Sequence, residues 1–191
     1  SKLWYKEPAK VWEETLPLGN GLIGMMPDGK INDESIVLNE ISMWSGSPQD
    51  ANNYKAMNSV GEIQKLLFEG KNDLAEALVN KNFVCVGAGS GQGNGAEAPY
   101  GAFQNLGFMN FLFFHQGETT DYKRWLDIAD AKAVTSFNNN GTHYLREYFT
   151  SFDKNVGVVR LSADKKKSIE FAMHFYRDQN IEDYKINGNE I

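Results

Sequence analysis

Most of the chain carries the two-residue alternation of apolar and polar positions that is typical of β-strands. The alternation is strongest at residues 108–114, where both faces are apolar and burial on both sides is therefore predicted. Residues 133–137 and 142–149 flank Asn140-Gly141, two residues that tolerate positive φ, so the sequence predicts a hairpin there. Further strands are predicted at residues 18–26, 36–38, 155–162 and 169–176.

One stretch has the helical period instead. Ser59 and Glu62 fit a capping box, the apolar positions that follow recur at i, i+3 and i+4, and Gly70 supplies a stop. Asn72 is predicted to cap a second helix. The pattern therefore predicts a mostly β protein with a short helical pair inserted at about 59–81.

Composition and charge remove several classes of protein. The 191 residues carry 41% hydrophobic residues, which is enough for a packed core, and a formal charge of −6, which argues against a nucleic-acid partner. The longest apolar run, residues 108–114, is too short to span a membrane. Cys85 is the single cysteine, so neither an intrachain disulfide nor a Cys-rich zinc site is expected.

No motif in the chain predicts catalysis, a metal or a cofactor. The glycine-rich run at 87–95 contains the spacing of a dinucleotide fingerprint, but Pro99 and Gly101 prevent the helix that such a site needs, so we expect a loop. The three histidines lack metal-ligand spacing, and the G-x-S-x-G motif of a serine nucleophile is absent. The carboxylates do not single out a general acid–base pair.

The densest group of unusual residues follows the strand at 36–38. Asn39, Glu40 and Trp44 bring an amide, a carboxylate and an indole together, the combination that binds sugar rings and their hydroxyl groups. The alternative is a core tryptophan under a loop, with Asn39 and Glu40 fixing the turn. With Asn20 in the glycine-containing segment 18–21, we expect these residues to cluster at one end of the sandwich, as a substrate-binding or domain-interface surface.

Several stretches, in this order along the chain, resemble glycoside hydrolase family 95, whose members include α-L-fucosidases that act on 1,2-linked fucose. The resemblance covers roughly residues 4–175. Its motifs are Trp12-Glu13-Glu14-Thr15-Leu16-Pro17-Leu18-Gly19-Asn20-Gly21, Leu38-Asn39-Glu40, Trp44-Ser45-Gly46, Glu62-Ile63, Leu66-Leu67, Glu69-Gly70, Tyr122, Arg124, Leu126-Asp127, Arg146-Glu147 and Arg160-Leu161.

The resemblance implies that the chain is the non-catalytic N-terminal domain of an inverting, exo-acting α-L-fucosidase. That domain is a large β-sandwich of the super-sandwich type. The resemblance therefore implies a mostly antiparallel β-sandwich, a single and truncated domain over residues 1–191 with the helical pair inserted in it. Catalysis in the family lies in a later (α/α)6 barrel, where a glutamic acid is the general acid and asparagines assisted by an aspartate activate water. The implied partners are the barrel of the same polypeptide and a fucosylated oligosaccharide. No cofactor, nucleic-acid partner or membrane is expected. The implied location is secreted or periplasmic, in a bacterium. The pattern of residues 184–191 predicts a hairpin whose second strand contains only its first residues. A truncated chain is therefore expected.

Three departures from the family pattern keep other functions open. Leu22 stands where an arginine is usual, and Asn105 and Phe108 stand where a proline and an acidic residue are usual. An α-L-galactosidase-type parent enzyme therefore remains an alternative. A free-standing carbohydrate-binding module, with exposed Trp or Tyr residues on a concave face, is a second, and an unrelated β-sandwich interaction domain is a third.

Overall fold

The computed structural model describes residues 1–46, 48, 50–87 and 101–177. The chain divides into two compact units, residues 1–43 with 104–191 and residues 44–103, which are described separately. The expected glycine-rich loop at 87–95, apart from Gly87, and the hairpin expected at 184–191 lie outside the described residues.

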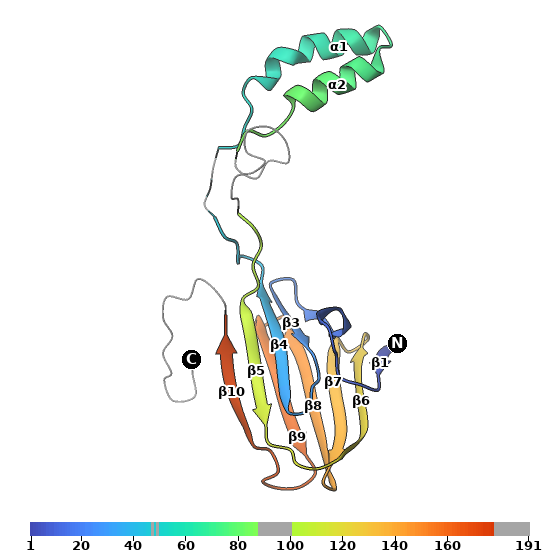
Figure 1. Ribbon diagram of the computed structural model, residues 1–191, viewed down its shortest axis with the longest axis vertical. Coiled ribbons are helices and arrows are strands. Elements are labelled where there is room, and N and C mark those ends of the chain that lie inside the picture. The colour runs from blue at the N-terminus through green and yellow to red at the C-terminus, as the bar shows by residue number, and fades with distance from the viewer. Residues whose placement is uncertain (47, 49, 88–100, 178–191) are drawn as a thin grey trace. The chain divides into compact units, whose positions relative to one another are not determined.

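The first unit is a sandwich of antiparallel sheets, which confirms the predicted fold class (Figure 1). Within the described residues, one sheet has the order β1-β6-β7-β8-β9 and the other β10-β5-β4-β3-β2. The strands of the first sheet are β1 (Lys2–Tyr5), β6 (Thr119–Asp127), β7 (Lys132–Asn139), β8 (Thr142–Ser151) and β9 (Val156–Ala163). The strands of the second sheet are β2 (Leu18–Gly19), β3 (Ile23–Pro27), β4 (Asp33–Glu40), β5 (Gly107–Phe113) and β10 (Phe171–Tyr176).

The Asn140-Gly141 hairpin forms as predicted. These two residues join β7 to β8 with φ values of 51° and 69°, the left-handed conformation that a two-residue hairpin loop of this type requires. The strands on either side pair in register from Asn139–Thr142 down to Ala133–Tyr148. The turn therefore fixes which side chains of β7 and β8 face the interior.

The interior of the sandwich is built from alternate residues of both sheets. The buried apolar side chains that form one cluster are Leu16, Leu18, Met25, Ile36, Phe111, Phe113, Ala133 and Tyr148. The expectation that residues 108–114 are buried on both sides is wrong, because Leu112 and Phe114 are exposed. Phe111 and Phe113 face the opposite sheet, whereas Leu112 and Phe114, on the other face, are about half exposed.

The second unit contains a helical pair, α1 (Val60–Phe68) and α2 (Asn72–Asn82), preceded by a 3₁₀ turn, η2 (Ala56–Ser59). Gly70, with φ at 72°, ends α1 as predicted. Ser59 is the N-cap of α1, but the predicted capping-box hydrogen bond is absent, because η2 runs directly into α1 and leaves Ser59 in a helical conformation. Lys71, rather than Asn72, is the N-cap of α2.

Neither helix of the described chain reaches the length and apolar character required for a membrane span. A second 3₁₀ turn, η1 (Trp12–Glu14), lies in the first unit between β1 and β2.

Candidate functional site

Asn20 holds the turn between β2 and β3 and ties it to the turn between β8 and β9. Its side-chain oxygen accepts hydrogen bonds from the backbone N–H groups of Leu22 (3.0 Å) and Ile23 (2.9 Å). Its amide nitrogen donates to the carbonyl of Ser151 (2.8 Å) and to Oδ1 of Asn155 (3.2 Å). All four hydrogen-bonding positions of the Asn20 amide are thereby occupied within the fold.

Asn39 and Glu40 are the last residues of β4 and lie opposite Gly24 and Ile23 of β3. The Glu40 carboxylate accepts hydrogen bonds from the backbone N–H of Ser42 (2.9 Å) and from the Ser42 hydroxyl, so it closes the turn after the strand. The Asn39 Cβ lies 3.6 Å from the position that a Cβ on Gly24 would take. The base of the Asn39 side chain therefore lies beside Gly24 of β3, and Asn39 is partly exposed.

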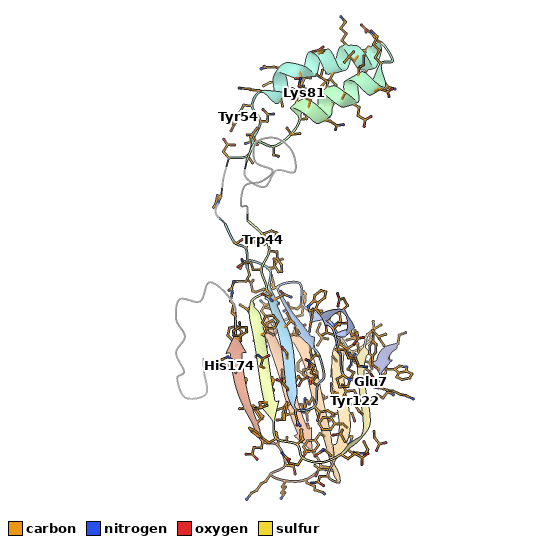
Figure 2. The ribbon with its side chains drawn as sticks, in the orientation of Figure 1. Glu7, Trp44, Tyr54, Lys81, Tyr122 and His174 are labelled. Atoms are coloured by element: carbon orange, nitrogen blue, oxygen red, sulfur yellow. The ribbon has the colours of Figure 1, made fainter. Side chains whose placement is uncertain are left out.

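Trp44 belongs to the second unit, where it forms a β-bridge with Phe103 (Figure 2). The two rings meet edge to face, with centroids 5.6 Å apart. The backbone N–H of Ser45 donates to the carbonyl of Ala102 at 2.9 Å, which continues the pairing. Trp44 is 62% exposed, so it is not the core tryptophan of the alternative interpretation.

The structure thus brings Asn20, Asn39 and Glu40 to adjacent parts of the β2–β3–β4 meander, while Trp44 is placed only within its own unit. Whether these four residues bind substrate or a neighbouring domain stays a prediction. The geometry does separate their local roles, because the Asn20 amide and the Glu40 carboxylate are engaged in turns, whereas Asn39 makes no side-chain hydrogen bond to the described residues.

A buried ionic group, which sequence reasoning missed, lies between the sheets. Arg146 donates from Nη1 to Oε2 of Glu34 (2.9 Å), and the Tyr148 hydroxyl donates to Oε1 of the same carboxylate. Arg146 also donates to the carbonyls of Lys30 (2.7 Å) and Ile31. Burial raises the pKa of Glu34, although Arg146 and Tyr148 act in the opposite direction.

A second buried arginine, Arg124 on β6, anchors the segment that precedes β2. Its Nε donates to the carbonyl of Glu7 (2.8 Å) and its Nη1 to the carbonyl of Glu14 (2.6 Å). Its guanidinium lies 4.1 Å from the ring centroid of Tyr5. Arg124 therefore links the outermost strand and its following loop to the sheet, which is a structural role.

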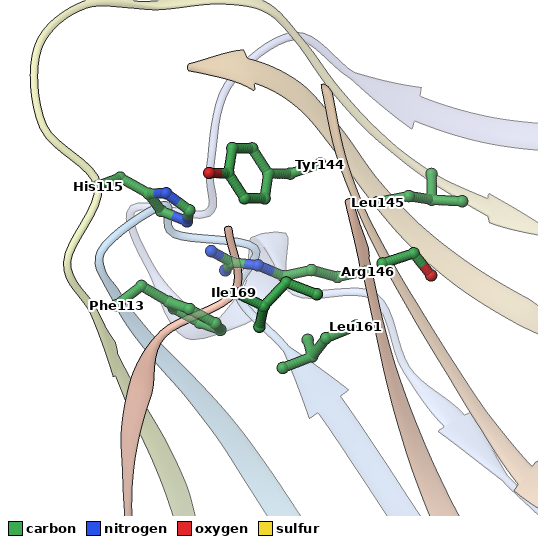
Figure 3. Close-up of a pocket in the computed structure, with 8 residues that line it drawn as sticks. Phe113, His115, Tyr144, Leu145, Arg146, Leu161 and Ile169 are labelled. Carbon is green, nitrogen blue, oxygen red and sulfur yellow. The ribbon is translucent and has the colours of Figure 1, made fainter. Parts of the chain in front are cut away.

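The pocket beside Arg146 is too small for a sugar. Figure 3 shows the Arg146 side chain pointing between Phe113 and the pair His115 and Tyr144. The free space is about 10 Å³, roughly what one water molecule needs. Burial, together with the positive charge of Arg146, lowers the pKa of His115 to about 4, so its imidazole is neutral at pH 7.

Across residues 1–46, 48, 50–87 and 101–177, no three or more His, Cys, Asp and Glu side chains are arranged to hold a metal ion. The carboxylate with the greatest burial, Glu34, is bound to Arg146 and Tyr148 and has no access to a substrate. The described geometry is that of an antiparallel sandwich whose interior is occupied by side chains, with polar turns and several exposed aromatic residues, Trp4 and Trp12 among them, on the surface.

Comparison with known proteins identifies the chain as an N-terminal domain of glycoside hydrolases. Residues 3–190 match the family described as glycosyl hydrolase family 65, N-terminal domain. The chain belongs to this family of N-terminal domains.

Three relatives have names that refer to fucosidases. The chain is 30% identical over 177 residues to "Alpha-L-fucosidase 2" of Arabidopsis thaliana, covering 91% of this chain and 20% of the relative. It is 25% identical over 189 residues to "Probable alpha-fucosidase A" of Aspergillus oryzae, covering 97% of this chain and 24% of the relative. It is 27% identical over 183 residues to the protein of the same name in Aspergillus niger, covering 92% and 21%. The chain thus spans only about a fifth to a quarter of these relatives.

Proposed function

We propose that the chain is the non-catalytic N-terminal domain of an inverting, exo-acting α-L-fucosidase of glycoside hydrolase family 95, and that an (α/α)6 barrel in the same polypeptide removes terminal fucose from glycans. Membership of the N-terminal domain family and three relatives named as fucosidases support this proposal. The motifs around residues 12–21 and 38–46 support the assignment to family 95.

The observation that carries the proposal is the exposed apolar surface of the helical unit. The helices α1 and α2 bury only Ile63 and Ala75 as they pack on one another, whereas Phe68 is 92% exposed. Other large apolar side chains that the unit exposes are Tyr54, Met57, Leu67 and Leu74. A surface of this kind is typical of a protein–protein contact, because water-exposed apolar area is stabilised by burial against a partner.

We assign this partner to the catalytic domain of the same polypeptide. On the first unit, the surface of the β2–β3–β4 meander offers polar groups of its own, since Asn39 makes no side-chain hydrogen bond to the described residues and Asn20 and Glu40 fix the backbone of the turns. The domain then works by supporting the barrel and by shaping one rim of its active site.

The experiment compares the 191-residue chain with the complete polypeptide on a 1,2-fucosylated oligosaccharide and measures released fucose. We expect release by the complete polypeptide and none by the chain alone. Release by the chain alone would contradict a non-catalytic role. A complete polypeptide that releases L-galactose from an α-L-galactoside, but no fucose, would replace the fucosidase with the α-L-galactosidase-type parent.

A further inference from the structure

Two tryptophans lie side by side on the outer face of the first sheet. Trp4 of β1 and Trp125 of β6 are direct partners in the antiparallel register. Their sequence neighbours Tyr5 and Leu126 pack against the interior core, so alternation along the strands directs both indoles outward. Trp4 is 51% exposed. Figure 1 shows the two strands next to each other at one edge of the sandwich.

Lysine side chains surround these indoles. The Lys123 Nζ lies 5.4 Å from the ring centroid of Trp4 and 5.9 Å from that of Trp125, so one ammonium contacts both rings. The Lys6 Nζ lies 5.9 Å from the Trp4 ring and the Lys2 Nζ 5.7 Å from the Trp125 ring. Lys2 is paired with Asp127 at 3.3 Å, whereas Lys6 and Lys123 have no carboxylate partner within the described chain.

A row of polar side chains continues from the indoles across β6, β7 and β8. Asn138 donates from Nδ2 to Oδ2 of Asp121 (2.7 Å), so its Oδ1 faces Nδ1 of His143 (2.9 Å). Because Oδ1 can only accept, His143 carries its proton on Nδ1 when neutral, and its Nε2 is left to accept from the Ser136 hydroxyl at 3.5 Å. This row fixes Asp121 and Ser136 in place and leaves Oδ1 of Asp121 open as an acceptor.

These side chains enclose a hollow. Its volume is about 290 Å³, close to the lower end of the range for small-molecule sites. It is lined by Lys2, Trp4, Asp121, Lys123, Trp125 and Ser136. An apolar platform with a few placed polar groups is the composition of a site for one or two sugar rings.

We propose that this hollow binds an acidic oligosaccharide, a sugar chain that carries carboxylate or sulfate groups. The indoles of Trp4 and Trp125 contact the C–H face of a sugar ring, and the Lys123 ammonium, which lies over both rings, binds its anionic substituent. Asp121 Oδ1 and the Ser136 hydroxyl accept hydrogen bonds from ring hydroxyls. Lys123 is the lysine of the hollow that has no carboxylate partner within the described chain, and its charge favours an acidic over a neutral ligand. The inference stands on this surface alone and does not depend on the proposed fucosidase activity.

The test is titration calorimetry of the chain with three oligosaccharides of equal length: oligogalacturonate for carboxylate, a heparin fragment for sulfate, and an uncharged malto-oligosaccharide. We expect binding of at least one acidic probe, weaker at higher salt because the charges are exposed. Trp125→Ala should weaken it by about tenfold or more, which is about 1.4 kcal/mol. Lys123→Gln, which removes no ring, should abolish the preference for the acidic probe over the neutral one.

Matched controls lie elsewhere on the chain. Trp12 is 59% exposed and outside the hollow, and Lys166 is an exposed lysine without an ion pair in the described chain. Trp12→Ala and Lys166→Gln should leave the affinity unchanged, and thermal unfolding should show every variant folded.

Three results would overturn the inference: no binding of either acidic probe, equal affinity for the uncharged probe, or equal losses from Trp12→Ala and Trp125→Ala. Binding of poly-glutamate with the affinity of the acidic sugars would also overturn it, because it would assign the surface to an acidic peptide. The carboxylate and sulfate probes together decide which anionic group is recognised.

Discussion

At the scale of single residues, Arg146 is a side chain that joins the two sheets. It joins β8 to the Glu34 carboxylate of β4 and to two carbonyls of the β3–β4 turn, and its guanidinium lies 3.7 Å from the Phe113 ring centroid. Arg146→Met keeps much of the volume but leaves Glu34 buried without its counter-charge. We expect a loss of about 3–5 kcal/mol in the free energy of unfolding, measured by urea denaturation.

A double variant separates the contribution of the charge pair to the free energy of unfolding from that of side-chain packing. Glu34→Leu combined with Arg146→Met removes both charges, so its loss should be clearly smaller than the sum of the two single losses. Additive losses would show that Arg146 acts through its bonds to the carbonyls of Lys30 and Ile31 alone.

His115 gives the sandwich a sensitivity to acid. The folded protein keeps the pKa of His115 near 4 through burial and the charge of Arg146, whereas an unfolded chain takes up this proton near the ordinary value of 6.5. Acidification from 6.5 towards 4 therefore favours the unfolded state, and the stability that the neutral imidazole contributes is lost across this window. We expect the melting temperature of His115→Phe, measured from pH 7 to 4, to fall less steeply than that of the wild type.

His174→Gln is the matched control, because His174 lies exposed on β10. Its pH profile should follow the wild type. Identical profiles for the wild type and His115→Phe would show that His115 does not produce the acid sensitivity.

The buried charges also mark where residue-scale prediction from sequence fails. Arg146 and Glu34 stand in alternating strands, where a charged residue is normally assigned to the solvent face. A signal was present, because Tyr144, Arg146 and Tyr148 share one strand face and the two tyrosines suit an interior. Which carboxylate meets Arg146 could not be predicted, since Glu34 is 112 residues away in the sequence and meets it only through the sheet packing.

At the scale of elements, features that depend on local backbone conformation could be predicted from the sequence, whereas features that depend on tertiary contacts could not. Asn140-Gly141 and Gly70 act through their own backbone conformations, so the hairpin and the end of α1 could be predicted. The predicted burial of residues 108–114 on both sides failed at Leu112, because alternation locates a strand without showing whether another layer covers its second face. The candidate site shows the same limit, since the turns around Asn20 and Glu40 follow from local signals but their partners do not.

The turn between β3 and β4 offers a direct test of element packing. Gly29 has φ at 71°, and a Cβ there would lie 2.7 Å from the Tyr122 hydroxyl and 3.0 Å from Cδ of Arg124. Neither neighbour can easily move, because Tyr122 donates to the Gly29 carbonyl at 2.7 Å and Arg124 is held by two backbone carbonyls. We expect Gly29→Ala to lower the free energy of unfolding by about 2–4 kcal/mol.

Gly117→Ala is the matched control for that substitution. Gly117 has a similar φ of 77°, but nothing lies within 4 Å of its added Cβ. We expect Gly117→Ala to lower the free energy of unfolding only by the cost of the backbone strain, about 1 kcal/mol. Equal losses at both positions, measured by urea denaturation, would contradict a packing role for the turn at Gly29.

At the scale of the whole molecule, partners are proposed for two different surfaces. The sandwich carries the indole and lysine hollow at its β1–β6 edge, and the helical unit exposes Phe68 and its apolar neighbours. The two surfaces suit partners of different size. A sugar ligand occupies a hollow of a few hundred Å³, whereas an apolar helix surface is stabilised by a much larger protein–protein contact. The chain therefore offers two separate surfaces, one for the proposed docking and one for the proposed sugar ligand.

Trp44 tests whether the proposed docking surface of the second unit includes the indole that pairs with Phe103. An indole at a domain interface contributes a large apolar contact, and its truncation commonly costs about 2 kcal/mol or more. We expect Trp44→Ala to lower the melting temperature of the complete polypeptide, with kcat/KM on a fucosylated oligosaccharide retained. The chain alone should lose less, because there Trp44 is 62% exposed. Trp12→Ala in the complete polypeptide is the control for removing an exposed indole. A fall in kcat/KM at unchanged melting temperature would instead place Trp44 in the substrate site, and an unchanged enzyme would remove both roles.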